Sequence, residues 1–215
     1  MKICLYTDII VAVIIIKGVI LMANFKVPVG LSNRHIHLKQ DDIDILFGKG
    51  YTLKKYKDLG QPGQYACEEK VDIVGPKGML KGVRVLGPAR PETQIEISMT
   101  DARVLGLSAP VRDSGDLADS PGAKIIGSKG EVDLEKGVIV AARHIHMHTS
   151  DAEKAGLKDK DEVNVKVDGK RGVIFNNVLV RVSEKYALEM HVDLDEGNAA
   201  QMANGESVEI LKQVK

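Results

Sequence analysis

Tryptophan is absent from the sequence, and aromatic side chains make up 4% of its 215 residues, so the core must be aliphatic. The two cysteines, Cys4 and Cys67, are too few for a disulfide framework and favour a reducing compartment. Neither sign of charge dominates, because 30 Lys and Arg residues balance 30 Asp and Glu residues. This balance argues against nucleic acid binding, which usually needs a basic surplus. With 44% hydrophobic and 28% charged residues, we expect a folded soluble protein.

The longest apolar stretch lies near the N-terminus and is too short for a membrane span. Residues 9–16 form an unbroken apolar run, which Lys17 then interrupts. A signal peptide is disfavoured because Asp8 stands where positive charge is needed and no small-residue cleavage site follows. The run is also apolar on every side, unlike an amphipathic targeting helix. We interpret residues 1–24 as a dispensable apolar extension, with Met22 as an alternative translation start; a targeting or anchoring role is the competing interpretation.

Beyond residue 24, alternating apolar and polar residues predict short β-strands. The clearest cover residues 71–73, 83–85, 95–97, 163–167, 178–182, 188–194 and 208–210. Few helices are expected, and all are short. They cover residues 41–47, 151–155 with Ser150 and Glu153 as a capping box, and 196–204. The fold class is therefore mainly β, with one or two barrels and short helical inserts.

One motif occurs twice in the chain, about half the chain length apart. Residues 34–37 read Arg-His-Ile-His, and residues 143–146 repeat the same four residues. In both copies an aspartate follows the second histidine by five residues and opens a predicted helix, as Asp42 and Asp151. The duplication indicates two related halves that meet at a shared site. The Ser-, Pro- and Gly-containing residues 113–130 form the expected flexible connection before the second half.

The duplicated motif contains histidines in a spacing that suits metal binding. On a strand, residues i and i+2 point to the same face, so His35 and His37 present two imidazoles side by side. His144 and His146 do the same, while the intervening isoleucines point into a core. Paired imidazoles on a rigid face are what zinc or a similar divalent metal needs. A lone histidine is usually a surface residue or is bonded to a carbonyl, but duplication argues for ligands.

Four other residues are ambiguous from the sequence. His191 and Glu96 lie on the polar faces of predicted strands, where each is either exposed to solvent or a metal ligand. His148 shares a face with the second histidine pair but stands just before a predicted helix cap, so we interpret it as a spectator. Cys67 has no nearby partner and is interpreted as an inert thiol.

Four segments resemble the phosphate propanoyltransferases of the propanediol-utilization type, phosphotransacylases often found in bacterial microcompartments. They are VPVGLSNRHIHL at residues 27–38, GPARPETQIE at 87–96, ARHIHM at 142–147 and HVDLDEGNAA at 191–200. The resemblance spans residues 25 to about 211, which is the whole chain except the apolar extension at residues 1–24, here called the apolar head. Leu194 and Gly197 depart from the family pattern, which has Thr and Ala there, and neither carries chemistry.

The resemblance implies two β-barrel domains with a two-metal centre between them. The first would cover residues 33–142 and the second 143–211, with residues 25–32 joining the second as a strand. It also implies the site residues. One zinc would be held by His35, His37 and Glu96, and the other by His144, His146 and His191. Arg90 would bind phosphate. The coenzyme A site would be lined by Ser32, Lys57, Arg84, Leu86, His191 and Asn198. A homodimer, and a cytoplasmic location that could be inside a microcompartment, are further implications of the resemblance.

The residues suit the implied reaction, in which acyl-CoA and phosphate give acyl phosphate and coenzyme A. Zinc stabilises a thiolate and polarises a carbonyl oxygen. An arginine such as Arg90 grips phosphate with two parallel N–H donors, which a lysine cannot do. No Ser-His-Asp set or activated cysteine is evident, so we expect direct attack in a ternary complex, without an acyl-enzyme. The acyl group would be short, propanoyl or acetyl.

Two other classes of function compete with this interpretation. A zinc hydrolase of the amidohydrolase type needs a (β/α)₈ barrel of about 250 residues, and the chain lacks the helices. The metallo-β-lactamase pattern has an aspartate where this chain has His148. A non-catalytic metal-binding or shell-associated protein would leave Arg90 and the coenzyme A residues without a purpose.

Overall fold

A computed structural model describes residues 14–16, 19–21 and 25–211 of the chain. The first strands are β1 (Ile14–Ile16), β2 (Val19–Leu21), β3 (Lys26–Ser32), β4 (His35–His37), β5 (Lys55–Asp58), β6 (Tyr65–Val74), β7 (Met79–Gly87), β8 (Gln94–Glu96) and β9 (Val111–Arg112). The others are β10 (Lys124–Ile126), β11 (Glu131–Asp133), β12 (Val138–Ala141), β13 (His144–Met147), β14 (Glu162–Val167), β15 (Val173–Val182), β16 (Glu189–Asp193) and β17 (Ser207–Leu211). The helices are α1 (Gln40–Phe47), α2 (Met99–Leu105), α3 (Thr149–Ala155) and α4 (Leu194–Ala200). The mainly β class with short helices is confirmed.

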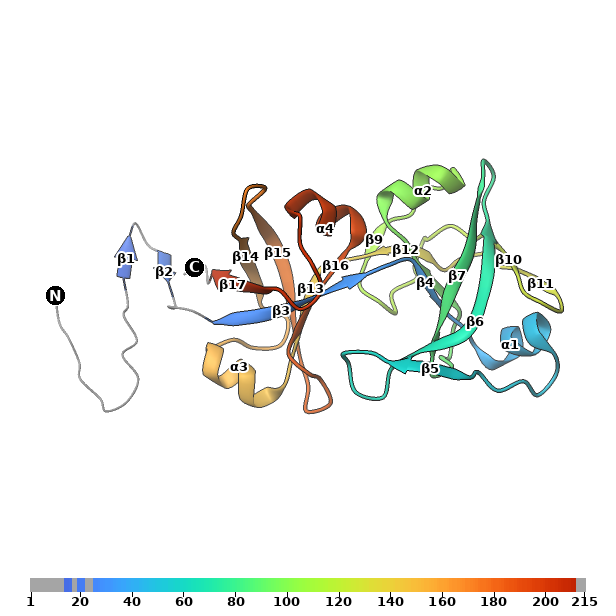
Figure 1. Cartoon of the computed structure of the whole chain (residues 1–215), viewed down its shortest axis with the longest axis horizontal. Helices are drawn as coiled ribbons and strands as arrows, with labels where there is room; N and C mark the ends of the chain where they lie inside the picture. Colours follow the sequence, from blue (N-terminus) through green and yellow to red (C-terminus); the bar gives the residue numbers. More distant parts are fainter. Residues whose placement is uncertain (1–13, 17–18, 22–24, 212–215) are drawn as a thin grey trace.

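Six strands close into a barrel in the order β13-β15-β14-β17-β3-β16. Five of them come from the C-terminal half of the chain, and β3 comes from the N-terminal side (Figure 1). β3 pairs in parallel with β16 and antiparallel with β17. Its residues Val27 and Val29 are buried because alternate side chains of a barrel strand point inward. The barrel therefore needs a strand that lies far from its other strands in the sequence.

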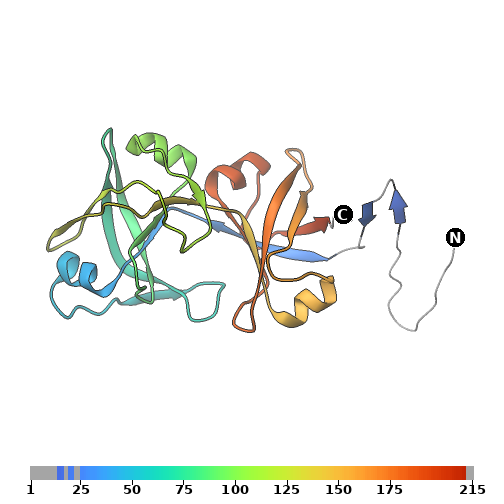
Figure 2. The same cartoon turned by 180° about the vertical axis from the view of Figure 1, so that it is seen from behind.

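The second sheet has nine strands and is curled rather than closed. Its order is β11-β10-β6-β7-β4-β8-β12-β9, with β5 added on β6. Of the two expected barrels, one is therefore closed, and the other is a curled half-barrel sheet. The strands at the two ends of the sheet, β11 with its neighbour β10 at one end and β9 at the other, are only two or three residues long. Such short strands offer few backbone groups for the pairing that would close a barrel. Seen from behind, the two units lie side by side (Figure 2).

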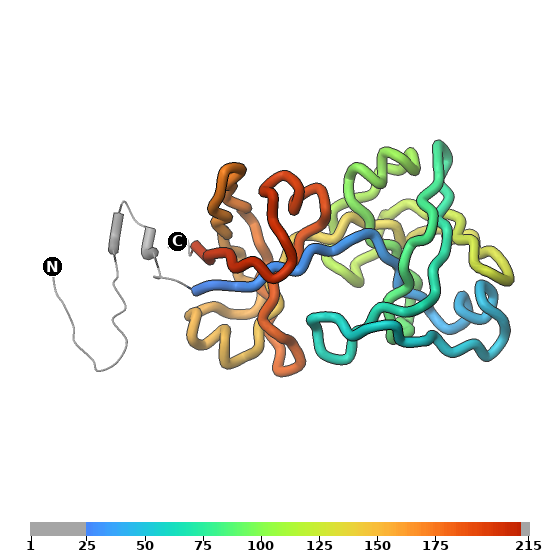
Figure 3. The backbone as a smooth tube through the Cα atoms, viewed as in Figure 1, coloured from blue at the N-terminus to red at the C-terminus, as the bar shows by residue number. Residues whose placement is uncertain are grey.

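The two units share an arrangement of strands around each His-x-His strand. β4 pairs in parallel with β7 and antiparallel with β8, and β13 pairs in parallel with β15 and antiparallel with β16. The leading strands are exchanged: β12, which precedes β13, pairs with β8, whereas β3, which precedes β4, pairs with β16. The backbone trace follows β3 out of the barrel into the other unit, and the chain returns through β12 (Figure 3). Both His-x-His strands therefore begin at the junction.

Hydrophobic side chains form two core clusters, one in each unit. Ile36 belongs to the first, and Ile145 and Met147 belong to the second, all with no exposed surface. The residues between and after the paired histidines thus point into the cores, as the strand period predicts. This packing holds the histidine side chains on the opposite faces, toward the junction.

The helices differ from the sequence expectation at several ends. Asp42 and Asp151 were expected to open helices, and each lies in the first turn of one, as its third residue. The expected cap Ser150 is wrong, because His148 caps α3 by accepting a hydrogen bond from the Ser150 backbone N–H. The expected helix at 196–204 begins earlier and ends earlier, since Asp193 and Glu196 form the capping box of α4 and Gln201 adopts a left-handed conformation.

Two further expectations need correction. Helix α2 was not expected from the sequence, although Ser98 and Asp101 form a capping box at its start. The predicted flexible connection at 113–130 contains β10, which pairs with β6. Part of the apolar head, at residues 1–13, 17–18 and 22–24, lies outside the described residues, and β1 and β2 pair with each other. Among the described residues, no helix is long and apolar enough to cross a membrane.

Candidate active site

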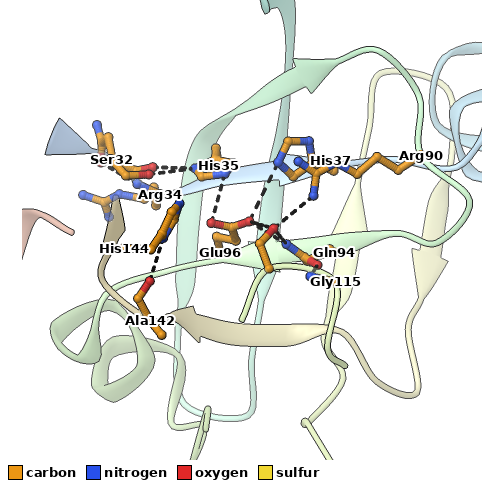
Figure 4. A network of polar contacts seen from close by, with 12 residues as sticks. Ser32, Arg34, His35, His37, Arg90, Gln94, Glu96, Gly115, Ala142 and His144 are labelled. Carbon is orange, nitrogen blue, oxygen red and sulfur yellow. Dashed lines mark hydrogen bonds and ion pairs between the residues drawn. The ribbon is translucent and has the colours of Figure 1, made fainter. Parts of the chain in front are cut away.

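The first histidine pair meets Glu96 across two paired strands. His35 on β4 is the register partner of Glu96 on β8, and the His35 Nε2 atom lies 3.4 Å from Glu96 Oε2. His37 Nε2 lies 3.8 Å from the other carboxylate oxygen of Glu96. The His35 Nδ1–H donates to the Asn33 carbonyl at 2.8 Å, which leaves Nε2 available as a ligand atom. Figure 4 shows the Glu96 carboxylate facing both imidazoles.

Burial and mutual charge set the protonation of this cluster. Burial lowers the pKa of His37 to about 3, and the charges of His35 and Arg90 contribute to the same shift. Burial also opposes a charged His35, but the neighbouring Glu96 carboxylate raises the pKa of His35 above its ordinary value. Although burial alone would raise it, the two histidines hold the pKa of Glu96 well below its usual range. The cluster therefore combines a neutral imidazole and a carboxylate, which are good metal ligands.

Glu96 is supported by polar side chains from the same sheet and from the loop after β9. The Gln94 amide N–H donates to Glu96, and the Ser114 hydroxyl donates to Glu96 Oε1 at 2.9 Å. Gln94 also accepts the Gly115 backbone N–H at 2.8 Å. Arg90 joins this network because its Nη1 donates to the Ser114 hydroxyl at 3.2 Å (Figure 4). Such outer contacts fix the orientation of a ligating carboxylate.

The second histidine pair meets His191 in the same way. His144 on β13 is the register partner of His191 on β16, and their rings stack with centroids 5.1 Å apart. The centroids of His146 and His191 are 5.0 Å apart. The His144 Nδ1–H donates to the Ala142 carbonyl at 2.8 Å, which repeats the contact of His35 (Figure 4). Burial lowers the pKa of His144 to about 4 and that of His146 to about 2, so both imidazoles are neutral near pH 7.

Both clusters fit a divalent metal ion. In each cluster, one ligand atom from every residue lies within 4.8 Å of the others. Two of the imidazole nitrogens, His37 Nδ1 and His146 Nδ1, are buried without a hydrogen-bond partner among the described residues. Buried polar atoms normally have partners, so this pattern suits a site that a metal completes. All six residues expected as ligands are brought together in two groups of three.

A single cavity of about 1020 Å³ contains both clusters. It lies at the junction of the two units, and its lining includes Arg90 and four of the residues expected to bind coenzyme A besides His191. These four are Ser32, Lys57, Arg84 and Leu86. Asn198 does not line the cavity, and its side chain is exposed on α4. Arg84 is partly engaged within the fold, since its Nη1 donates to the Cys67 carbonyl at 2.8 Å.

Sequence reasoning missed the role of the arginine that begins each copy of the motif. Arg34 Nη1 lies 2.8 Å from Asp101 Oδ1, and Arg143 Nη1 lies 2.7 Å from Glu196 Oε1. Asp101 and Glu196 are the third residues of α2 and α4, the helices that follow the strands carrying the third ligands. The repetition of the arginine beside both histidine pairs was the available signal.

Sequence reasoning also missed Glu189, Gln61 and Arg181. Glu189 Oε2 lies 3.1 Å from His191 Nε2 and accepts a hydrogen bond from the Gln61 amide at 3.2 Å. Gln61 comes from the loop between β5 and β6, and its amide also donates to the Ala187 carbonyl at 3.0 Å. All three line the cavity with the histidines. Gln61 and Arg181 had no local signal, whereas Glu189 stands two residues before His191 on the same face of its strand.

Two of the ambiguous residues lie outside the clusters. His148 caps α3 and belongs to neither group of ligands, so the interpretation as a spectator agrees with its position. Cys67 has no exposed surface, and burial raises the pKa of its thiol to about 12. A thiol in this state is a poor nucleophile.

The fold and the site together define a class of protein. Two β units that exchange their leading strands enclose one cavity. That cavity is lined by two groups of residues suited to bind metal and by the half-buried Arg90. Convergent polar groups with shifted pKa values in a large cavity are typical of an active site, here one suited to an anionic substrate.

Comparisons with known proteins identify the family within this class. The family model described as phosphate propanoyltransferase matches residues 28–203. The phosphate propanoyltransferase of Thermotoga maritima is 59% identical over 185 residues, covering 86% of this chain and 88% of the relative. That of Clostridioides difficile is 53% identical over 186 residues, covering 86% and 89%. That of Listeria monocytogenes is 48% identical over 189 residues, covering 88% and 89%. The chain belongs to the phosphate propanoyltransferase family and is an acyltransferase with a phosphotransacylase function.

Proposed function

We propose that the protein transfers a propanoyl or acetyl group between coenzyme A and inorganic phosphate by direct attack in a ternary complex. The observation that carries this proposal is the single cavity that contains both ligand clusters and Arg90. An acyl thioester and a phosphate bound there together would be held for reaction with each other. Binding both substrates in one site converts a bimolecular reaction into an effectively unimolecular one.

Two zinc ions are proposed as the resident cofactors. His35, His37 and Glu96 would hold one, and His144, His146 and His191 the other. When bound, zinc polarises the acyl carbonyl and stabilises a thiolate. The neutral imidazoles of His37, His144 and His146 and the low-pKa carboxylate of Glu96 are in the protonation states that metal binding requires.

Arg90 is proposed as the phosphate-binding residue. Its backbone N–H donates to the Leu38 carbonyl at 2.9 Å, and its Nη1 donates to the Ser114 hydroxyl at 3.2 Å. These contacts hold the guanidinium beside the first ligand cluster, while its remaining N–H groups can donate to an anion. A guanidinium presents two parallel donors to phosphate and so orients the attacking oxygen.

Coenzyme A is proposed to bind along the cavity lining formed by Ser32, Lys57, Arg84, Leu86 and His191. The cationic side chains among them suit a ligand that carries several phosphates. A contact with Asn198 stays a prediction, since its side chain lies outside that lining.

A covalent acyl-enzyme is not part of the proposal. Cys67 is fully buried with a raised pKa. The Ser32 hydroxyl lies 3.5 Å from His35 Nδ1, but this nitrogen already carries the hydrogen that it donates to the Asn33 carbonyl. The imidazole therefore cannot accept the Ser32 proton through that atom, which leaves Ser32 without a general base there.

The biological setting is proposed from the family. We propose two domains, at residues 33–142 and 143–211 with residues 25–32 joining the second, and a homodimer. A cytoplasmic location, inside a microcompartment if the apolar head directs it there, completes the proposal. The two separate hydrophobic cores agree with two domains.

The test is an assay of thiol release from propanoyl-CoA with and without phosphate, and with and without a chelator. We expect release that requires phosphate and that stops when the metal is removed. Phosphate-independent release would instead assign a zinc hydrolase. No release at all, from protein whose metal content is measured and full, would assign a non-catalytic metal-binding protein.

A further inference from the structure

Arg181 brings a second guanidinium to the cavity from the opposite unit. It lies on β15, where the parallel pairing with β13 makes it the register partner of His146. Its half-buried side chain lines the same cavity as Arg90, although the two residues belong to different sheets. Each unit thus contributes one arginine to the space beside the ligand clusters.

These two arginines differ from the arginines of the duplicated motif in their lack of an ion-pair partner among the described residues. Arg34 and Arg143 each form an ion pair, whereas no carboxylate in the described part of the chain forms one with Arg90 or Arg181. Burial is the main cause of the lowered pKa of Arg90; the Glu96 carboxylate opposes this shift, and the charge of Arg181 adds to it. Arg181 lies on the strand paired with the one that carries His146, and it lines the same cavity as Arg90.

A structural role does not account for Arg181. The Arg84 guanidinium, by contrast, is engaged by the fold, because it donates to the Cys67 and Glu68 carbonyls and lies 5.2 Å from the Tyr56 ring. Within the described residues, the Arg181 side chain makes no comparable hydrogen bond. Two cations without ion-pair partners in one cavity repel each other, and a bound anion would offset that repulsion.

We propose that Arg181 is a second phosphate-binding residue, and that Arg90 and Arg181 grip one phosphoryl group from the two units. The inference rests on the proposed function. Two guanidinium groups match the charge of a phosphate dianion, and each can donate two parallel N–H groups to its oxygens. In the reverse reaction the same pair holds the phosphoryl group of the acyl phosphate. No bond to either arginine forms or breaks.

The proposal is tested by steady-state kinetics of Arg181→Gln and Arg181→Lys with phosphate as the varied substrate. Arg181→Gln should raise the KM for phosphate about ten- to hundred-fold, and Arg181→Lys should raise it less. The KM for acyl-CoA should change less than about twofold, because Arg90 and Arg181 contact only the phosphoryl group. The matched control is Arg171→Gln, an exposed arginine in the turn between β14 and β15 that lines no described cavity. It should keep the wild-type values.

A second readout does not depend on turnover. Inorganic phosphate should raise the melting temperature of the wild-type holoenzyme, and this shift should be lost in Arg181→Gln as in Arg90→Gln. An unchanged KM for phosphate together with a wild-type shift in Arg181→Gln overturns the proposal. A rise confined to the KM for acyl-CoA also overturns it, because Arg181 would then bind coenzyme A.

Two outcomes remain separable from these. If Arg181→Gln does not fold, the Arg181→Lys variant tests the proposal instead. A raised KM for phosphate in this variant supports phosphate binding by Arg181, and a wild-type KM refutes it. If the wild-type protein releases no thiol in response to phosphate, the proposed function fails, and the melting shift still tests whether Arg181 binds the anion.

Discussion

Arg143 Nη1 lies 2.7 Å from Glu196 Oε1, and this ion pair connects the two strands that supply the second ligand cluster. Arg143 immediately precedes β13, and Glu196 forms the capping box of α4, which directly follows β16. The pair between Arg34 and Asp101 connects β4 and α2 in the same manner. Each ion pair thus holds a histidine pair in register with the third ligand of its cluster.

Removing this connection should weaken the second cluster selectively. In a double-mutant cycle of Arg143→Gln and Glu196→Gln, we expect a coupling free energy of about 1 kcal/mol in the free energy of unfolding, because both side chains are half-buried. Metal affinity should fall at the second cluster and persist at the first. Urea denaturation and metal titration measure the two effects. Losses that add within about 0.3–0.5 kcal/mol would show that the pair does not act as a unit.

The two ligand clusters should lose metal independently. His35→Ala removes a ligand of the first cluster and His144→Ala one of the second, so each variant should retain about one of two divalent ions. Elemental analysis of the purified variants gives the count. His148→Ala is the matched control, because His148 caps α3 outside both clusters and its loss should leave the metal content unchanged. Two variants with the full wild-type metal content would contradict the two-site assignment.

Arg90→Lys should impair the use of phosphate and spare coenzyme A. Loss of a bidentate, charge-assisted contact costs on the order of 1.5–3 kcal/mol, or roughly a ten- to hundred-fold drop in kcat/KM for phosphate. Initial rates with varied phosphate at saturating acyl-CoA measure this drop. If Arg90 only supported the turn that follows β7, lysine would behave almost as arginine does, and an unchanged kcat/KM would remove Arg90 from the site.

The thiol of Cys67 should resist alkylation in the folded protein. Its pKa is raised to about 12, so the reactive thiolate is disfavoured at every pH below that value, and its side chain has no exposed surface. In a Cys4→Ser background at about pH 8, iodoacetamide should label Cys67 only after denaturation. Raising the pH should speed the reaction little until the fold itself opens. Rapid labelling of the native protein would contradict the burial of this residue.

Deleting residues 1–21 should leave kcat and KM unchanged. The residues that line the cavity run from Gly30 to Asn204, and the family match begins at residue 28. The truncated protein should also keep its metal content. A truncated protein that folds and binds metal but has lost its turnover would show that the apolar head takes part in catalysis.

Some of the site could be read from the sequence because its signal is local. The histidines at 35, 37, 144 and 146 share strand faces through the period of two, and no knowledge of distant contacts is needed to pair them. Glu96 and His191 could not be assigned in this way, because the strand pattern shows only that each lies on the polar face of its strand. The resemblance to the family singled them out, and the pairing of β8 with β4 and of β16 with β13 brings them beside the histidines.

The sequence alone determined the strand-rich class and the paired imidazoles, because alternation and spacing act over a few residues. Tertiary structure decided the exchange of β3 and β12 between the units, and hence the meeting of both clusters in one cavity. It also decided that Arg181 lines the same cavity as Arg90, and that Gln61 reaches Glu189. These contacts join residues far apart in the chain, and they depend on how the strands pair and pack rather than on any local pattern.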